Sequence, residues 1–288
     1  MSEISRGDFI VTIRYSGERT LGECVRSVQN LELEYIIIET SPFWKAVVET
    51  FKLGVRENRL FTIGLDADIV LYSDALDKIT EFVCSNLGFW RYDFALDDKF
   101  YPHIIWGTHV YSTPFLREAL KHIPQNIDRI TKPERQFYYT MKEAGFQSKE
   151  GIPIVVGRHG YDQYYFHIFN RFARRALRNP EHEDVLFKDK SKKINQDSDW
   201  LFAWLGWQHG RANRSKEILI ADSENYVNIE GYLQKYGIPE KTEVSEWSSE
   251  TLQERPHMVT RRSITSRFRM RWLSTLRSKM CKKRSCIP

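Results

Sequence analysis

The sequence contains no apolar run that approaches the roughly 18–20 residues a helix needs to span a membrane. Its first residues also lack the basic segment and the long apolar stretch of a secretory signal peptide. We therefore expect a protein of the cytoplasm.

Cysteine is scarce, with four residues among 288: Cys24, Cys84, Cys281 and Cys286. Their scattered spacing excludes a disulfide framework and favours free thiols in a reducing compartment. The last two stand close together in "CKKRSC", where a disulfide or a metal site is an alternative. No histidine or further cysteine lies near that motif, so we favour free thiols.

Acidic residues are absent from residues 261–288, which carry ten lysines and arginines. The rest of the chain holds 33 basic and 38 acidic residues, so the net charge of +5 is a property of this tail. Apolar residues recur in it at every fourth position: Ile264, Phe268, Trp272, Leu276 and Met280. A basic amphipathic helix favours an anionic membrane surface. Nucleic acid, which attracts the same cations, is a less favoured alternative, and a solvated tail without structure is another.

Apolar residues are plentiful. They make up 41% of the chain and include 17 Phe, 14 Tyr and 8 Trp. Such a chain can bury a sizeable core, which excludes wholesale disorder. Its length suits one large domain or one domain with an appendage.

The first 87 residues alternate between strand-like and helix-like segments. Runs of β-branched and aromatic residues at 8–15, 34–39 and 60–65 predict three buried strands, and a segment of helical periodicity follows each. This alternation is typical of a parallel sheet with helices on its faces. Ligands bind such sheets beyond the carboxyl ends of the strands, so the turns after the three strands are predicted to share one binding edge.

Polar residues mark the starts of the three helices. Thr20 and Glu23 have the spacing of a capping box. Ser41 is predicted to cap a helix that has Pro42 at its first position. Ser73 is predicted to cap the third helix.

The middle of the chain is less regular. Aromatic and turn residues at 93–115 predict loops and mixed strands that cover the site. Residues 132–145 are typical of a helix, with a proline near its start and a glycine at its end. Residues 151–160 predict a short strand that runs into His159.

Two later segments, 161–179 and 198–210, are strongly helical and carry wide aromatic faces. We interpret these faces as core packing rather than a ligand platform, and we expect Pro180 to follow the end of the first helix. Residues 240–260 are polar and resemble a linker. The chain thus divides into a core at 1–160, an aromatic-rich helical extension at 161–240, and a linker with the basic tail at 241–288.

Asp66 and Asp68 stand at the end of the third predicted strand, where a buried charge needs a partner. Residues i and i+2 of a strand face the same way, so both carboxylates would point to one side of the edge. Placed there, they can hold one divalent cation, and hard oxygen ligands suit Mg²⁺ or Mn²⁺. The alternative is a pair of turn or capping aspartates, because Asp-x-Asp is a common pattern.

The ordered set "TIRYSGERTLGECVRSV", "EYIIIET" and "LDAD" resembles nucleotide-sugar-dependent glycosyltransferases of the GT-A fold, the family-2-like group. In that family an Asp-x-Asp motif binds metal and the donor diphosphate. The resemblance is clear over residues 1–75 and suggestive to residue 180. It implies an α/β fold with a Rossmann-like, mostly parallel sheet flanked by helices, and a helical C-terminal extension.

The resemblance implies nucleotide contacts at two turns. Tyr15, Ser16 and Glu18 match the first turn of the family, although the family usually has Asn where this chain has Ser16 and a glycine. Glu39 and Thr40 match the end of the second strand, where an acidic residue often contacts base or ribose.

The resemblance also implies a metal site. Asp66 matches the first aspartate of the motif, near ribose or metal, and Asp68 matches the principal metal ligand. Many GT-A enzymes add a late histidine as a metal or phosphate ligand, and His159 between two glycines is the candidate here. An ordinary hydrogen-bonded histidine is the alternative, and the neighbouring Arg158 can pair with phosphate instead.

An inverting enzyme needs a general base for the acceptor proton. The family often uses an acidic residue at a helix start, which Glu134 matches; Asp98 and Asp97 are its rivals. Trp106 and His109 lie in a segment that resembles the lining of the acceptor and donor-sugar site, with ordinary packing as the alternative.

We therefore expect a metal-assisted glycosyltransferase that moves a sugar from a nucleoside-diphosphate sugar to a glycan or lipid-linked acceptor, with Mn²⁺ or Mg²⁺. A nucleotidyltransferase is an alternative, but the first turn lacks the Gly-rich basic phosphate loop that those enzymes use. A non-catalytic sugar-nucleotide or membrane-binding module is the other.

Overall fold

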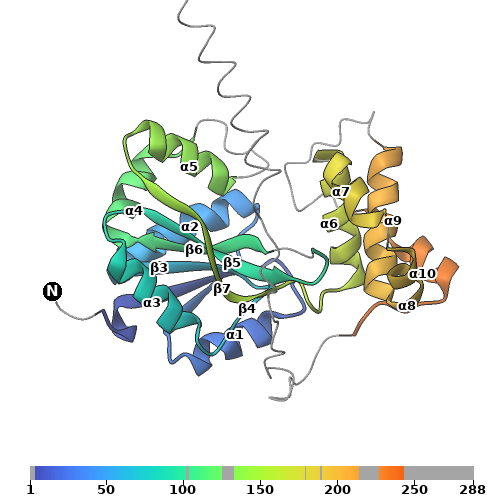
Figure 1. Cartoon of the computed structure of the whole chain (residues 1–288), viewed down its shortest axis with the longest axis horizontal. Helices are drawn as coiled ribbons and strands as arrows, with labels where there is room; N and C mark the ends of the chain where they lie inside the picture. The colour runs from blue at the N-terminus through green and yellow to red at the C-terminus, as the bar shows by residue number, and fades with distance from the viewer. Residues whose placement is uncertain are drawn as a thin grey trace, which may run out of the picture. The chain divides into compact units, whose positions relative to one another are not determined.

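The computed structural model describes residues 4–101, 104–124, 133–178, 180–188, 190–213 and 227–242 (Figure 1). The basic tail, the cysteine pair at its end and most of the expected linker lie outside the described residues. Within the described residues, no helix is both long and apolar enough to pass through a membrane.

A seven-stranded sheet in the order β2-β1-β3-β6-β5-β7-β4 forms the centre of the described chain. The strands are β1 (Phe9–Arg14), β2 (Tyr35–Ile38), β3 (Phe61–Asp66), β4 (Ile69–Leu71), β5 (Arg91–Asp98), β6 (Ile105–Ser112) and β7 (Ser148–His159). β1 pairs in parallel with β2 and β3, and β5 with β7. β6 runs antiparallel between β3 and β5, and β4 is antiparallel to β7. The expected α/β class is confirmed.

Helices cover both faces of the sheet (Figure 1). α1 (Leu21–Asn30) and α3 (Ala75–Ser85) share one apolar core with the strands. The opposite core contains α2 (Phe43–Glu57), α4 (Thr113–Ala119) and α5 (Pro133–Glu143). Two short 3₁₀ turns, Arg6–Asp8 and Leu120–His122, complete this part. The arrangement leaves the carboxyl ends of β1, β2 and β3 at one edge, as the alternation of the sequence predicted.

A second apolar core lies among the later helices. These are α6 (Tyr165–Arg178), α7 (Pro180–Phe187), α8 (Ser191–Gln196), α9 (Ser198–Ala212) and α10 (Glu230–Tyr236). α9 packs closely on α6 because it presents glycine there: a Cβ on Gly206 or Gly210 would lie 2.1 or 2.3 Å from a carbonyl oxygen of α6. The aromatic faces of α6 and α9 are buried in this core, which confirms that they are packing surfaces.

The capping box predicted at the start of α1 is wrong. Thr20 occupies the N-cap but makes no side-chain cap hydrogen bond. Its hydroxyl instead donates to the carbonyl of Ala67 at 2.9 Å, and Glu23 forms an ion pair with Arg158. Both side chains therefore hold distant segments rather than the helix end.

The other two predicted helix starts are wrong by one residue. Pro42, rather than Ser41, is the N-cap of α2, and Asp74, rather than Ser73, is the N-cap of α3. Neither N-cap accepts a hydrogen bond through its side chain. These helices are stabilised chiefly by their buried faces, as is usual for short amphipathic helices.

The middle of the chain is more regular than predicted. The segment expected to form loops and mixed strands contributes β5 and β6, two eight-residue strands in the interior of the sheet. β7 extends over twelve residues rather than being short. α6 begins at Tyr165, four residues later than expected, and Pro180 starts α7.

Candidate functional site

The Asp-x-Asp segment forms a turn at the carboxyl edge of the sheet. Asp66 is the last residue of β3, and Asp68 lies in the turn that leads to β4. The two are therefore not on one face of a continuous strand, and that part of the prediction is wrong. Backbone bonds fix the turn: Ala67 donates to the carbonyl of Arg14 at 2.9 Å, and Gly160 donates to that of Asp68 at 3.0 Å. The turn is thus tied to β1 and to the segment after β7.

Asp68 is the first member of a chain of charges. Its Oδ2 lies 3.1 Å from Nε2 of His159, whose Nδ1 lies 2.6 Å from Oδ2 of Asp98. Arg171 of α6 donates to the same oxygen of Asp98 at 2.6 Å. The other oxygen of Asp98 accepts the backbone amides of Phe100 at 2.8 Å and Tyr101 at 3.3 Å. Each carboxylate oxygen of Asp98 therefore has two hydrogen-bond donors, and the side chain has no exposed surface.

These contacts set the protonation of the group. Burial alone lowers the pKa of His159, but the carboxylates of Asp68 and Asp98 outweigh it and raise that pKa to about 9. Burial alone raises the pKa of Asp98, but Arg171 and His159 outweigh it and hold that pKa well below its usual range. At neutral pH the ring of His159 is an imidazolium between two carboxylates.

The divalent cation implied by the sequence resemblance fits Asp68. Its Oδ1 is buried and has no hydrogen-bond partner among the described residues. A buried carboxylate oxygen without a donor is suited to a hard cation. His159 fits less well in this form, because an imidazolium has no lone pair for a metal. Among the described residues, no three His, Cys, Asp or Glu side chains converge as a ready set of metal ligands.

Asp66 belongs to a second chain of charges. The β1–β3 register sets Arg14 opposite Asp66, and Nε of Arg14 lies 2.8 Å from Oδ1 of Asp66. Arg14 also pairs with Glu134, whose Oε2 lies 3.2 Å from Nε2 of His109. Nδ1 of His109 lies 2.8 Å from Oδ1 of Asp93. The chain thus runs from the Asp-x-Asp turn across β1 to α5, β6 and β5.

Arg91 closes this second chain. It donates to Oδ2 of Asp93 at 2.6 Å and to the backbone carbonyl of Glu134 at 2.8 Å. With His109 protonated, three cations balance three carboxylates, and of these six side chains only that of Asp66, 34% exposed, has substantial contact with solvent. Burying charges at such a cost in solvation is tolerable only because each one is paired.

The proton affinities in the second chain follow from this pairing. Burial works against the charged form of His109, but Glu134 and Asp93 outweigh it and raise its pKa to about 9. Burial alone raises the pKa of Glu134, but Arg14 and His109 outweigh it and hold that pKa far below its usual range. For Asp66, burial prevails over the attraction of Arg14 and raises the pKa to about 6.

His109→Gln is expected to flatten the pH dependence of stability. The pKa of His109 rises from 6.5 to about 9 on folding, so its contribution is complete below pH 6.5 and lost as the pH rises to about 9. The unfolding free energy of the variant should fall less across that window, by about 2–3 kcal/mol. Urea unfolding at several pH values measures this. The surface variant His122→Gln should keep the wild-type slope, and an unchanged slope in His109→Gln would contradict the assignment.

The first two turns lie at the same edge as the Asp-x-Asp turn. Ser16 donates to Glu18 through its backbone amide at 2.6 Å and its hydroxyl at 2.7 Å. Burial raises the pKa of Glu18. Tyr15 is half-buried against the sheet, and Glu39 and Thr40 follow β2 with exposed and half-buried side chains. The structure therefore brings the predicted nucleotide-contacting residues to one edge.

Trp106 lies at this edge too. His109 of β6 pairs with Gly64 of β3, so the first residues of β6 extend past the end of β3. The Trp106 side chain is 52% exposed there. His109 is buried, and both its ring nitrogens face carboxylates, so it contacts the site through Glu134.

Sequence reasoning missed Arg14, Asp93 and Arg171. Arg14 is the single charge of the strand "FIVTIR", where a charge at a position expected to be buried needs a partner, so this signal was available. Asp93 stands in "RYDFAL" with a second charge, Arg91, in a segment expected to form loops and mixed strands, so it gave no comparable signal. Arg171 gave no such signal, because arginines are usual on the polar side of an amphipathic helix.

No family model and no curated protein matches the chain. Solved structures do resemble it. A glycosyltransferase involved in glycosylation of the major capsid of PBCV-1 is 9% identical over 54% of this chain and 95% of its own, with a TM-score of 0.41. The mannosyltransferase PcManGT from Pyrobaculum calidifontis, in complex with GDP-Man and Mn²⁺, is 11% identical over 80% of this chain and 79% of its own, with a TM-score of 0.40.

A cytidylyltransferase from Leptospira borgpetersenii is 9% identical over 65% of this chain and 94% of its own, with a TM-score of 0.35. These neighbours are a glycosyltransferase, a mannosyltransferase and a cytidylyltransferase. At identities of 9–11% and TM-scores of 0.41 or lower, the likeness assigns no activity to this chain.

Proposed function

We propose that this chain is a nucleotide-sugar-dependent glycosyltransferase whose donor binds at the carboxyl edge of β1, β2 and β3. One observation carries the proposal: Asp68 presents a buried carboxylate oxygen without a partner among the described residues, in the turn after β3. The parallel pairing of β1 with both neighbours sets the first two turns beside it. A cation and a diphosphate would supply the partners that Asp68 lacks.

The donor nucleotide is proposed to contact the first two turns. Tyr15, Ser16 and Glu18 offer a half-buried ring, a hydroxyl and a carboxylate at the end of β1. Glu39 and Thr40 offer a carboxylate and a hydroxyl at the end of β2 for base or ribose. Polar groups at strand ends are where ligands of open α/β sheets are recognised.

Asp68 is proposed to hold Mg²⁺ or Mn²⁺ with Asp66, and His159 is proposed to orient Asp68. When bound, the cation would neutralise negative charge on the departing diphosphate. The chain's own contribution is orientation: His159 is fixed between Asp68 and Asp98, and Arg171 fixes Asp98 in turn. Such outer partners commonly set the direction of a metal-binding carboxylate.

Glu134 is proposed as the base for an acceptor hydroxyl. Its side chain is 19% exposed, whereas that of Asp98 has no exposed surface for an acceptor. The depressed pKa of Glu134 means that its contacts to Arg14 and His109 must weaken before it can accept a proton. Trp106 is proposed to stack on a sugar ring. We further propose a glycan or lipid-linked acceptor, a cytoplasmic location, and contact of residues 261–288 with an anionic membrane.

Calorimetry with UDP, GDP, CDP and dTDP, each with and without Mn²⁺, tests the proposal. We expect one nucleoside diphosphate to bind only when the metal is present, because Asp68 needs the cation to approach a diphosphate. The matching nucleotide sugar should then be hydrolysed slowly in the absence of an acceptor. Binding without donor hydrolysis would favour a non-catalytic module, and release of pyrophosphate from a nucleoside triphosphate would favour a nucleotidyltransferase.

A further inference from the structure

The end of the described chain returns from α10 to the first turn of the sheet. Gly237, with φ of +64°, ends α10 in the left-handed conformation that redirects the backbone. Ile238 then packs into the apolar core of the later helices. We call residues 238–242 the strap.

The strap first binds the start of α6. The carboxylate of Glu240 accepts the backbone amides of Tyr165 at 2.8 Å and Phe166 at 3.0 Å. Free amides at a helix start need acceptors, and a negative charge there is favourable. The strap therefore supplies a carboxylate cap for the start of α6.

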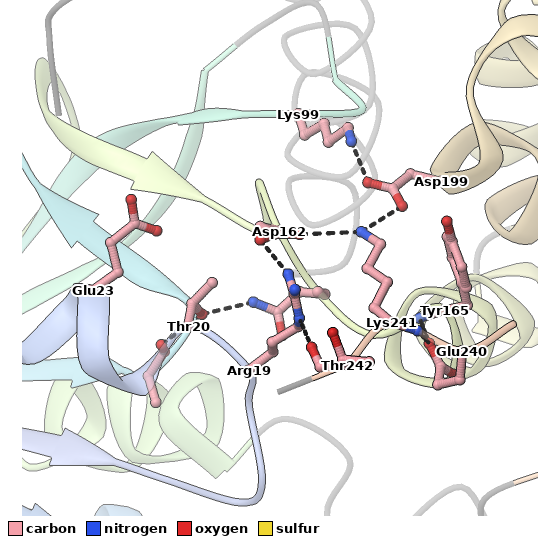
Figure 2. A network of polar contacts seen from close by, with 12 residues as sticks. Arg19, Thr20, Glu23, Lys99, Asp162, Tyr165, Asp199, Glu240, Lys241 and Thr242 are labelled. Carbon is pink, nitrogen blue, oxygen red and sulfur yellow. Dashed lines mark hydrogen bonds and ion pairs between the residues drawn. The ribbon is translucent and has the colours of Figure 1, made fainter. Parts of the chain in front are cut away.

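Lys241 of the strap stands in the middle of a row of alternating charges (Figure 2). Its Nζ lies 3.2 Å from Oδ1 of Asp162 and 2.7 Å from Oδ1 of Asp199. Asp162 also pairs with Arg19, and Asp199 also pairs with Lys99. The Lys241 side chain is only 16% exposed. Among the described residues, Lys241 thus joins the Arg19–Asp162 ion pair to the Lys99–Asp199 ion pair.

Hydrogen bonds also connect this row to the Asp-x-Asp turn. Nε of Arg19 donates to the carbonyl of Thr242 at 2.8 Å. Next to Asp162, the amide of Gln163 donates to the hydroxyl of Thr20 at 2.7 Å. Thr20 donates in turn to the carbonyl between the two aspartates at 2.9 Å. The contact between Lys241 and Asp162 is therefore linked to the proposed donor site through the side chains of Gln163 and Thr20.

We propose that the strap holds the first turn and the loop after β7 in the donor-binding arrangement, and that Lys241 is a positioning residue for donor binding. The inference rests on the proposed function for its ligand. Without Lys241, the Arg19–Asp162 pair and the Lys99–Asp199 pair are no longer connected. The first turn and the loop after β7 then occupy the binding-competent arrangement for a smaller fraction of the time. The apparent dissociation constant of the nucleotide rises in proportion to that loss of population.

Lys241→Met in the full chain tests the proposal, because it removes the charge and keeps most of the length. We expect about fivefold weaker binding of the nucleoside diphosphate with Mn²⁺. Lys241→Arg should restore binding to within about twofold, since it can still reach both carboxylates. Lys235→Met, an exposed lysine of α10, is the matched control and should bind as the wild type does. Wild-type affinity in Lys241→Met would overturn the proposal.

A double-mutant cycle with Asp162→Asn guards against a general loss of structure. If Lys241 acts through Asp162, the combined variant should bind little more weakly than the poorer single variant; additive losses would contradict this.

Hydrogen exchange measured without nucleotide tests the structural role of the strap independently of the proposed transferase function. Amides of residues 15–20 and 160–164 should exchange faster in Lys241→Met. Faster exchange in a protein whose wild type binds no nucleoside diphosphate would overturn the proposed function and leave the holding role of the strap intact. Unchanged exchange would contradict the proposal that the strap holds these two segments in place.

Discussion

Asp68→Asn is expected to reduce sugar transfer and donor hydrolysis by about a thousandfold or more, because it removes the charge that would hold the cation. The amide has nearly the same shape, and its remaining oxygen can still face Nε2 of His159, 3.1 Å away in the native protein. Metal-dependent binding of the nucleoside diphosphate should disappear together with activity. Rates with the matched nucleotide sugar, with and without acceptor, measure the effect.

The control for this prediction is Asp77→Asn, on the exposed face of α3, which makes the same chemical change away from the site. It should leave the rate unchanged. Circular dichroism and the melting temperature establish that Asp68→Asn remains folded. A folded Asp68→Asn protein that retains more than about a tenth of the wild-type rate would refute the assignment of Asp68.

The parts of the fold that the sequence predicted are those whose signal is local. β1, β2 and β3 are short apolar runs between amphipathic helices, and each buried face is readable within a few residues. The position of Asp66 and Asp68 at the carboxyl edge of the sheet follows from that alternation. β5 and β6 were expected only as unspecified strands among loops, because their aromatic, glycine and turn residues resemble loop sequence until the partner strands are known.

The parts of the site that escaped prediction depend on contacts between distant residues. Arg14 and Glu134 meet across 120 positions of sequence, and Gln163 and Thr20 across 143. No local pattern encodes such a meeting. Thr20 is an example. The sequence correctly placed it at the start of α1 but predicted the wrong hydrogen bond, because its hydroxyl donates to the Asp-x-Asp turn and does not cap the helix. Tertiary demands override local preference where a polar side chain has two possible partners.

Arg14→Met is expected to lower the free energy of unfolding by about 3–5 kcal/mol, the usual cost of removing one partner from a buried ion pair. Arg14 is buried and contacts Asp66 and Glu134 through two different nitrogens. Methionine fills much of the volume and leaves both carboxylates without that cation. Arg14→Lys should recover only part of the lost stability, since a single ammonium cannot reproduce the two-sided contacts of the planar guanidinium. Urea unfolding at pH 7 measures both variants.

Arg56→Met provides the comparison. Arg56 is 64% exposed and pairs with its neighbour Glu57, so its loss should cost less than about 0.5 kcal/mol. Adding Glu134→Gln to Arg14→Met should return part of the stability, because it removes one of the stranded charges. A cost below about 1 kcal/mol for Arg14→Met would contradict the arrangement of the second charge chain.

The same substitution should impair the site beyond its effect on folding. The pKa of Asp66 is about 6 with Arg14 present, because burial outweighs the attraction of the guanidinium. Removing that attraction raises the pKa further, so that Asp66 becomes largely protonated at neutral pH. Metal-dependent nucleotide binding by folded Arg14→Met should then strengthen as the pH rises, whereas the wild type, in which Asp66 is already mostly ionised at pH 6.5, should change much less over the same range. Isothermal titrations at pH 6.5, 7.5 and 8.5 compare the pH dependence of binding in the wild type and in Arg14→Met. Parallel pH profiles would contradict the claim that Arg14 controls the ionisation of Asp66.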